Sequence, residues 1–554
     1  MPSTPTTKSQ VQAYRFVLRR MQSALVRKDA VMLHDPMRTH QRSVVAGMAL
    51  AAVALLGFLI FGVISPKASP PSAGEIVMAQ PSGGIYVAVE QNNALQLIPM
   101  MNMASAQLLQ MRMQGGASAG LPEPSFVSDD VLADITIGSQ LTGIPGAPEK
   151  MPSSERRIDP VWTVCDWASF DDSLANPAAS ASAETSVLAG VHDLPGRALA
   201  EDEVVVARSE ADGEMWAIYR PDDTRAGSRA VVRAWVDPNH QVNQATLASG
   251  LREPHLMTEA LLNSIPTVDD YAAPDIPDQG LPADRELVLP DGNAAGIGTV
   301  VAALDASGQG RDYYVVLNSG YQDIPEGVAE LIRWSQGQAQ AEVPLVERVD
   351  ITRLGAAADA DLVEIRDLPS RPLRPVPYME NPVTCFAWNG SDDRERTELR
   401  VGEDIELRGA DASDDDPLLE RVRLGADNAA DYFFMPPGNA AVVRSTTSEG
   451  SFQSGPIHFV SDRGVRYAIP DMRHVTALGL LPENSTLPPA PEPILRLLPA
   501  GPRLDQNNAD LVFDYVPFDE SGDRRLDVEE GAGEYVPDPD GVGDGWFEGF
   551  PQDG

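Results

Sequence analysis

Residues 44–64, VVAGMALAAVALLGFLIFGVI, form an unbroken apolar stretch with no charged residue and no proline. As an α-helix, a stretch of this length rises about 32 Å, which is enough to cross a hydrocarbon core of about 30 Å. A helix buried in a globular core normally shows a polar face, and this stretch has none. The sequence therefore predicts a single transmembrane helix at 44–64.

The charges on the two sides of this stretch differ in sign. Residues 1–43 carry eight Lys/Arg and two Asp, which leaves 34 of 42 Lys/Arg and 79 of 81 Asp/Glu for the rest of the chain. The excess of basic residues before the span predicts a cytoplasmic N-terminus, with the bulk of the chain extracytoplasmic. A cleaved signal peptide is disfavoured because its basic region would exceed 40 residues. We expect an uncleaved anchor in the cell (inner) membrane.

The basic segment 1–43 begins with a helical pattern over residues 8–34, which Asp35-Pro36 ends. Apolar residues recur there at steps of three and four, from Val11 through Tyr14, Leu18, Met21 and Leu25. Two interpretations stay open: a basic amphipathic helix resting on anionic inner-membrane lipid, or a docking helix for cytoplasmic partner subunits. The docking interpretation assigns the contact residues Tyr14, Arg15, Phe16, Arg19, Arg20 and Arg27.

Both cysteines lie beyond the predicted span, in similar apolar and aromatic runs. Cys165 lies in WTVCDW (162–167) and Cys385 in PVTCFAW (382–388), and each run is typical of a strand. In an oxidising compartment the two can pair; two unrelated buried thiols are the alternative. Neither cysteine has a neighbouring cluster of His or Cys, so we expect no metal site there.

Beyond the span the sequence indicates an α+β fold with about four related β-α modules. Each shows aromatic or β-branched strands, a polar hairpin and a short helix. In EVVVARSEADGEMWAIYR (203–220), for example, a D-G turn separates two alternating strands. The placement of the Cys runs between modules suggests a central β domain made of two distant segments. The predicted divisions are a linker (65–74), modules (75–120, 203–290, 291–370 and 440–510), the two central segments (121–202 and 371–439) and an acidic disordered tail (511–554).

Motifs for catalysis are missing from the sequence. There is no G-x-x-x-x-G-K-[ST], and the four lysines stand at 8, 28, 67 and 150, none after a glycine loop. There is also no H-E-x-x-H. Ser461, Asp471 and His474 lie near one another in sequence, but their segment fits a plain hairpin and helix. We expect no catalytic residue, cofactor or bound metal, and the net charge of −39 argues against nucleic-acid binding.

Several motifs together resemble the EccB family, the bitopic membrane component of type VII (ESX) secretion systems in actinobacteria. They are QVQAYRFVLRRMQSALVRKDAVMLHDPMRTHQRS (10–43), IYVAV…LIPMMNMASAQLL, GIPGAPEKMP, VWTVCDW, RDYYVVLNSGYQ, NPVTCFAW and LLPAGPRLDQNNAD (497–510). The matches are collinear to about residue 510. The stretch before GIPGAP lacks an arginine expected in relatives.

The resemblance implies an elongated periplasmic region in which repeats surround a centre that contains a disulfide. It implies partners: EccC, EccD and EccE-like subunits, a mycosin-type protease, and other copies of the chain. On this basis we expect a structural, non-catalytic scaffold subunit. Two alternatives remain: a nucleotide hydrolase, since family members are often labelled ATPase although no P-loop is present here, and a peptidoglycan-binding periplasmic module.

Overall fold

The structure is a computed structural model that describes most of the chain from residue 7 to residue 513. The described ranges are 7–28, 36–64, 70–91, 94–114, 124–138, 140–148, 151–152, 155–171, 173–174, 177–222, 230–337, 342–391, 394–405, 407, 419–425, 429–481 and 485–513. Contacts divide the chain into two compact units: Met1–Pro70 with Asp130–Leu132, and Pro71–Asp129 with Ala133–Gly554.

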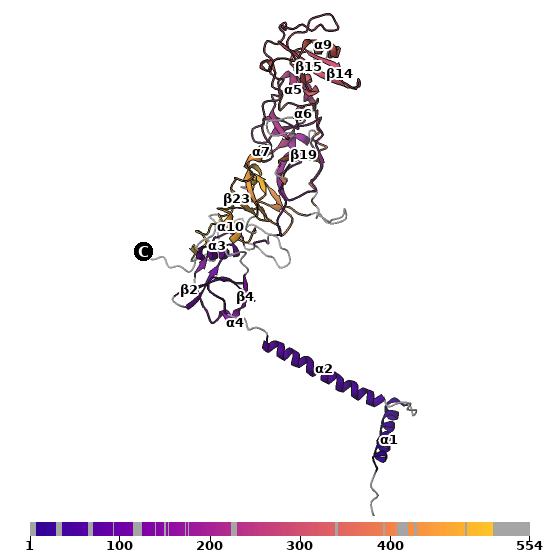
Figure 1. Ribbon diagram of the computed structural model, residues 1–554, viewed down its shortest axis with the longest axis vertical. Coiled ribbons are helices and arrows are strands. Elements are labelled where there is room, and N and C mark those ends of the chain that lie inside the picture. The colour runs from indigo at the N-terminus through magenta and orange to yellow at the C-terminus, as the bar shows by residue number, and fades with distance from the viewer. Residues whose placement is uncertain are drawn as a thin grey trace, which may run out of the picture. The chain divides into compact units, whose positions relative to one another are not determined.

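Two helices, α1 (Lys8–Arg27) and α2 (Pro36–Ile64), form the described part of residues 1–70 (Figure 1). At the start of α1 the side chain of Gln10 accepts a hydrogen bond from the backbone N–H of Thr7 (2.9 Å). Helix α2 begins at a proline, which suits a first helical turn, and contains all of the apolar stretch 44–64. Among the residues that the structure describes, no helix is assigned as long and apolar enough to cross a membrane.

Four sheets of the second unit share one order of elements. In each, three consecutive strands pair antiparallel, a helix follows, and the chain then returns parallel to the first strand. A parallel return needs a crossover connection, which the helix supplies. In the third sheet the return is a single bridge between Ala302 and Leu345 rather than a strand.

The first of these sheets gains strands at its edge. Its repeated part is β1 (Ile76–Gln80), β2 (Ile85–Gln91), β3 (Ala94–Met100), α3 (Met103–Met113) and β4 (Ser125–Ser128), and α4 (Asp129–Leu132) follows. The edge beyond β3 adds β5 (Thr136–Ile137), β6 (Leu141–Thr142) and β26 (Val512–Phe513). Strands β4 to β6 lie in the range 121–202 that the sequence assigned to the centre, so the predicted boundary at residue 120 falls inside this sheet.

The second and third sheets follow in the chain. The second contains β10 (Glu203–Ser209), β11 (Met215–Tyr219), β12 (Val232–Trp235), α5 (Gln241–Thr246), α6 (Ala248–Arg252), β13 (His255–Met257) and α7 (Glu259–Ser264), with β17 (Arg374–Pro375) beside β10. The third contains β14 (Val300–Leu304), β15 (Arg311–Leu317), β16 (Gly320–Ile324), α8 (Glu326–Ser335) and α9 (Arg348–Leu354). The expected D-G turn joins β10 to β11, where Gly213 takes a φ of 77° that glycine adopts without strain.

The fourth sheet and the central sheet complete the second unit. The fourth contains β22 (Ala441–Thr446), β23 (Ile457–Val460), β24 (Arg466–Ile469), α10 (Met472–Ala477), β25 (Pro489–Pro491) and α11 (Glu492–Leu495). The central sheet has the order β20-β21-β8-β7-β18-β19-β9. Its strands are β7 (Val161–Ser169), β8 (Ser182–Ala189), β9 (Arg197–Ala198), β18 (Val383–Asn389), β19 (Arg396–Gly402), β20 (Val422–Arg423) and β21 (Tyr432–Phe434).

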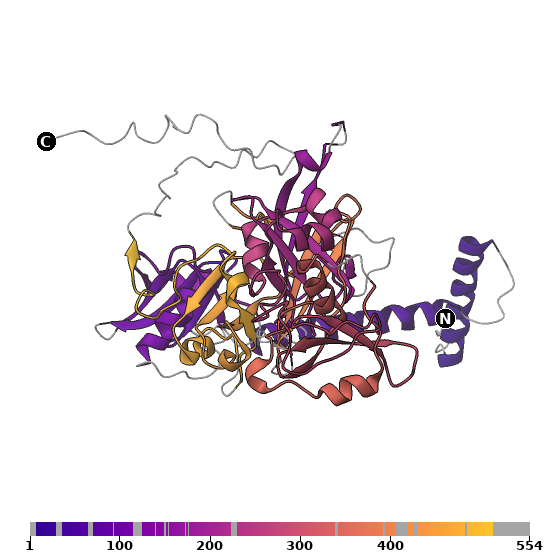
Figure 2. The same cartoon turned by 90° about the horizontal axis from the view of Figure 1, so that it is seen from above.

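Shared cores connect these sheets. One core joins the central sheet to the second and fourth sheets, for example through Val164, Val205 and Val443. Another joins the first sheet to the fourth, for example through Leu108 on α3 and Val475 on α10. Helices α3 and α10 accordingly lie side by side, and the first and fourth sheets are neighbours in both views (Figures 1 and 2). Apolar contact therefore holds together sheets that are far apart in sequence.

Candidate functional site

A disulfide joins Cys165 on β7 to Cys385 on β18 in the central sheet. The two residues stand directly opposite each other in the antiparallel register, with their Cα atoms 4.0 Å apart. Both are fully buried. They are separated by 220 residues, and the second and third sheets lie in that interval. The disulfide therefore closes the chain around these two sheets.

The two faces of the central sheet have different neighbours. Side chains alternate between faces along a strand. On one face the disulfide packs against Phe434 and other apolar residues of the same domain. On the other face Val164 and Phe386 join the core shared with the second and fourth sheets. The disulfide thus joins β7 to β18 on the face of the central sheet that points away from that shared core.

One charged residue, Asp166 of β7, lies where the central sheet meets α7. Its Oδ2 accepts a hydrogen bond from the backbone N–H of Thr258 (2.7 Å). Its Oδ1 accepts from the hydroxyl groups of Thr185 (2.8 Å) and Thr258 (3.0 Å), whose oxygens are themselves 2.7 Å apart. Thr258 is the N-cap of α7. A single carboxyl group therefore connects two strands of the central sheet to a helix of the second sheet.

Burial controls the ionisation of this carboxyl group. It raises the pKa of Asp166 to about 7, although the hydrogen bonds from Thr258 and Thr185 act in the opposite direction. The negative charge of Glu210 adds a smaller upward effect on that pKa. A second carboxylate, Asp431, accepts a hydrogen bond from the backbone N–H of Thr185 (2.7 Å). The junction thus holds a carboxyl group that changes charge near neutral pH.

A buried histidine lies beside the same junction. The Nε2 atom of His255 is 3.1 Å from the carbonyl oxygen of Val376, and its ring packs on Tyr378 with centroids 4.6 Å apart. Burial lowers the pKa of His255 to about 4, despite the opposing effect of the hydrogen bond to Val376. The ring is therefore neutral at pH 7, with its proton on Nε2 so that it can donate to the carbonyl. His255 serves as a hydrogen-bonding core residue.

The residues assigned to docking lie on α1, and several are open to solvent. Tyr14 is 66% and Phe16 is 50% exposed, and Arg15 and Arg20 are exposed as well. Arg19 is half-buried, and the side chain of Arg27, the last residue of the helix, lies outside the described residues. The apolar stripe predicted from the sequence is also exposed, and it comprises Val11, Tyr14, Leu18, Met21 and Leu25. An exposed apolar stripe of this kind is typical of a surface that binds a partner or a membrane.

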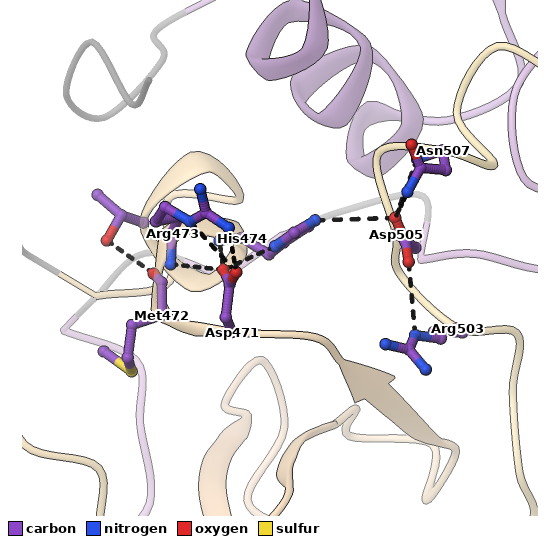
Figure 3. Close-up of polar contacts among 8 residues, drawn as sticks. Asp471, Met472, Arg473, His474, Arg503, Asp505 and Asn507 are labelled. Carbon is purple, nitrogen blue, oxygen red and sulfur yellow. Dashed lines mark hydrogen bonds and ion pairs between the residues drawn. The ribbon is translucent and has the colours of Figure 1, made fainter. Parts of the chain in front are cut away.

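The Ser461, Asp471 and His474 grouping does not form a hydrolase triad. The Nδ1 atom of His474 bonds to Oδ1 of Asp471 (2.8 Å), and its Nε2 faces Asp505 at 3.9 Å (Figure 3). Ser461 instead contacts the backbone of Val465 within its own turn. His474 thus faces a carboxylate at each ring nitrogen rather than the hydroxyl of Ser461, so it cannot activate that serine. His474 connects α10 to the segment around residue 505.

Within the described ranges no group of three or more His, Cys, Asp or Glu side chains is arranged to hold a metal ion. Sequence reasoning missed the junction of Asp166, Thr185 and Thr258. The one signal in the sequence was an aspartate in the otherwise apolar run WTVCDW.

The fold and the junction define a class of protein: several small α+β sheets fixed to one disulfide-linked central sheet. The family model described as "Type VII secretion system ESX-1, transport TM domain B" matches residues 3–518. The chain belongs to this family, EccB of type VII secretion systems.

Named relatives and solved structures are similar to most of the chain. It is 31% identical to "ESX-3 secretion system ATPase EccB3" of Mycolicibacterium smegmatis, over 92% of this chain and 91% of the relative. It is 30% identical to "ESX-5 secretion system ATPase EccB5" of Mycobacterium tuberculosis, over 93% and 95%. Its fold is similar to a chain of an intact ESX-5 inner membrane complex (27% identity, TM-score 0.61, covering 94% and 98%) and to the EccB3 dimer of an ESX-3 core complex (28%, 0.60, 79% and 100%).

Proposed function

We propose that the chain is a non-catalytic, membrane-anchored scaffold subunit of a type VII secretion complex, which links cytoplasmic subunits to a periplasmic assembly. The observation that carries this proposal is the similarity over 94% of the chain to a component of an intact ESX-5 inner membrane complex. The EccB3 dimer supports association of the chain with further copies of itself. Subunits of the EccC, EccD and EccE kinds and a mycosin-type protease are proposed as the other partners.

The proposed anchor is the apolar stretch 44–64, crossing the inner membrane once with the N-terminus in the cytoplasm. Two features support it: its 21 uncharged residues all belong to the single helix α2, and the basic excess lies before it. In this arrangement α1 is the cytoplasmic docking element. The basic residues of α1 and its exposed apolar stripe suit contact with partner subunits and with the adjoining lipid surface.

We also propose that the four sheets with one order of elements are copies of one module around the central domain. Their common order, with a helix before each parallel return, supports this division. The acidic tail from residue 514 onward lies outside the described residues. The scaffold interpretation needs no catalytic step. In this interpretation the buried disulfide and the Asp166 junction hold the second and third sheets in a fixed position on the central sheet.

The names of the relatives favour one other candidate, an ATPase. The chain offers no lysine for a phosphate loop, since none follows residue 150. Affinity purification from the native membrane tests the two functions together. The scaffold proposal expects the other subunits of the complex to co-purify with the tagged chain. It also expects the isolated chain to lack nucleotide turnover once contaminating ATPases are removed. A chain that purifies alone, or that hydrolyses nucleotide with saturable kinetics, would overturn the proposal.

A further inference from the structure

Three arginines from separate segments of the fourth sheet line one cavity of about 540 Å³. Arg444 belongs to β22, Arg473 to α10, and Arg503 to the segment after α11. The side chains of Arg473 and Arg503 are 67% and 60% exposed, so the cavity is open to a ligand from solvent. Apolar residues form much of the remaining wall: Pro456, Ile457, Ala468, Ile469, Pro470 and Met472.

The cavity carries a surplus of positive charge. Among the described residues that line it, Asp471 is the only carboxylate, and its oxygens already accept hydrogen bonds from the side chains of Arg473 (2.7 and 3.2 Å) and His474 (2.8 Å) (Figure 3). Partial burial opposes its ionisation, but these bonds outweigh burial and hold the pKa of Asp471 well below its usual range. Arg503 also lies 3.6 Å from Asp505, which is not among the lining residues (Figure 3), so three guanidinium groups face two carboxylates and one positive charge remains in excess in a chain of net charge −39.

The chemistry of the lining selects a carboxylate on an organic body. Guanidinium groups bind carboxylates through paired N–H donors. The neighbouring proline, isoleucine and methionine walls suit the apolar part of a peptide better than a fully hydrated inorganic anion. The side chain of Arg444 is held at the cavity wall because its Nη1 donates to the carbonyl oxygen of Gly455, another lining residue (2.9 Å). An acidic peptide segment fits this combination.

We propose that this cavity binds the chain's own acidic C-terminal segment, residues 514–554. That segment carries 13 Asp/Glu against two Arg. It starts directly after β26, whose last residue, Phe513, is ten residues beyond Arg503. The ten residues from Arg503 to Phe513 span at most about 35 Å, so Phe513 lies within that distance of Arg503. Ten further residues after Phe513 are therefore long enough to reach back to the cavity. Acidic residues from Asp523 onward therefore have the necessary reach.

Tethering makes a weak site effective. Because the cavity and the segment belong to one chain, the local ligand concentration is on the order of millimolar, so millimolar affinity is enough for substantial occupancy. The contacts are between exposed charges, and added salt screens them. The segment is thus held at low ionic strength and released at high ionic strength, or when a more acidic competitor occupies the cavity.

Zero-length crosslinking tests this proposal in the purified full-length chain. The substitution Arg503→Lys introduces a primary amine where the sequence has no lysine after residue 150. Carbodiimide then joins that amine to any carboxylate in contact with it. Peptide mass spectrometry is expected to find position 503 joined to Asp or Glu within 514–554. The yield should exceed that of a control amine by about tenfold and fall in 1 M salt.

Arg353→Lys is the matched control, because Arg353 is also exposed and also paired with a nearby aspartate, Asp350. Adding Arg444→Ser and Arg473→Ser to the Arg503→Lys variant is expected to reduce the crosslink to the control level, with circular dichroism checking that the fold is kept. Equal yields at positions 503 and 353 would overturn the proposal. Mixing isotopically labelled and unlabelled chains adds a further test: crosslinks formed mainly between two chains would also overturn it, because they would assign the segment to a neighbouring copy.

Discussion

The carboxyl group of Asp166 and the backbone N–H of Thr258 meet at 2.7 Å across the boundary between the central sheet and α7. Three oxygens gather beside this bond: Oδ1 of Asp166 and the hydroxyls of Thr185 and Thr258, with all three separations at or below 3.0 Å. Two hydroxyl groups supply only two protons for three contacts. In the ionised state Oδ1 accepts from both hydroxyls, and the contact between the two hydroxyl oxygens has no proton; with a third proton, on Asp166, a closed ring of three hydrogen bonds can form.

The first prediction concerns the pH dependence of this junction. Folding raises the pKa of Asp166 from 3.8 to about 7, so the folded state binds the proton more tightly than the unfolded state. The resulting stabilisation is fully present below pH 3.8 and is lost as the pH rises through about 7. Between pH 5 and pH 8 we expect the free energy of opening the junction to fall, on the order of 2 kcal/mol. Glu210 adds to this trend because its negative charge disfavours ionised Asp166.

Hydrogen exchange of the α7 peptides, corrected for intrinsic rates, measures this effect. Asp166→Asn keeps an acceptor for Thr258 and a donor for the hydroxyl ring, and it cannot ionise. This variant is expected to remove the pH dependence of α7 protection. Asp212→Asn, in the exposed turn after β10, is the control and should leave the dependence unchanged. A wild-type junction whose protection rises from pH 5 to pH 8 would contradict the expected sign of the effect.

The second prediction concerns the disulfide. Its ring of about 220 residues restricts the unfolded chain, and loop-closure entropy assigns it about 5 kcal/mol of stabilisation. We expect the double variant Cys165→Ala/Cys385→Ala to unfold at a markedly lower denaturant concentration than the wild type. Because both sulfurs are buried, reductant should leave the native disulfide intact and reduce it only after unfolding. Free thiols in mass spectra of the native, non-reduced protein would contradict the pairing.

The elements that the sequence predicted well are those with local signals. The D-G turn, the strands on either side of it, and the two similar cysteine runs were all visible in the residues, and the structure pairs those runs strand to strand. Pro36 is predicted from the sequence to end the first helix, whereas the structure begins α2 there. Proline disfavours the helix before it and suits the first turn of the next, so the same residue fits both roles.

The elements that were missed depend on distant partners. Strands β5 and β6 have two residues each, too short to show an alternation, and they belong to the first sheet only because β3 lies beside them. Asp166 has the sequence context of an ordinary strand aspartate. Its partner Thr258 is 92 residues away, so no local pattern could indicate that the pair forms the junction. Topology, rather than periodicity, creates this part of the site.

The third prediction concerns Gly455, which lies beside β22. A Cβ atom at this position would overlap the carbonyl oxygen of Ser445, which belongs to the backbone and cannot rotate away as a side chain could. We expect Gly455→Ala to destabilise the fourth sheet by at least about 3 kcal/mol, measured as a shift in the unfolding midpoint. Gly450→Ala is the matched control from the same connection, where the nearest contact is a side-chain oxygen at 4.0 Å. Similar unfolding midpoints for Gly455→Ala and Gly450→Ala would contradict this prediction, because β22 would then have moved to make room for the added Cβ atom.

The last prediction separates the two possible partners of α1. Tyr14 and Phe16 are exposed aromatic residues on a helix that also carries exposed Arg15 and Arg20. If α1 docks on protein subunits, Tyr14→Ala and Phe16→Ala each remove a buried aromatic anchor, and we expect the amount of co-purified cytoplasmic subunits to fall about tenfold.

Arg15→Glu/Arg20→Glu should additionally weaken flotation of the chain with anionic vesicles, because basic residues provide the attraction to an anionic surface. Gln22→Ala, at an exposed position of the same helix, is the control for both measurements. Docking on protein subunits predicts that the aromatic variants lose co-purification while vesicle binding is largely kept. Loss of vesicle binding with unchanged co-purification would instead assign α1 to the lipid surface and remove it from the docking interface.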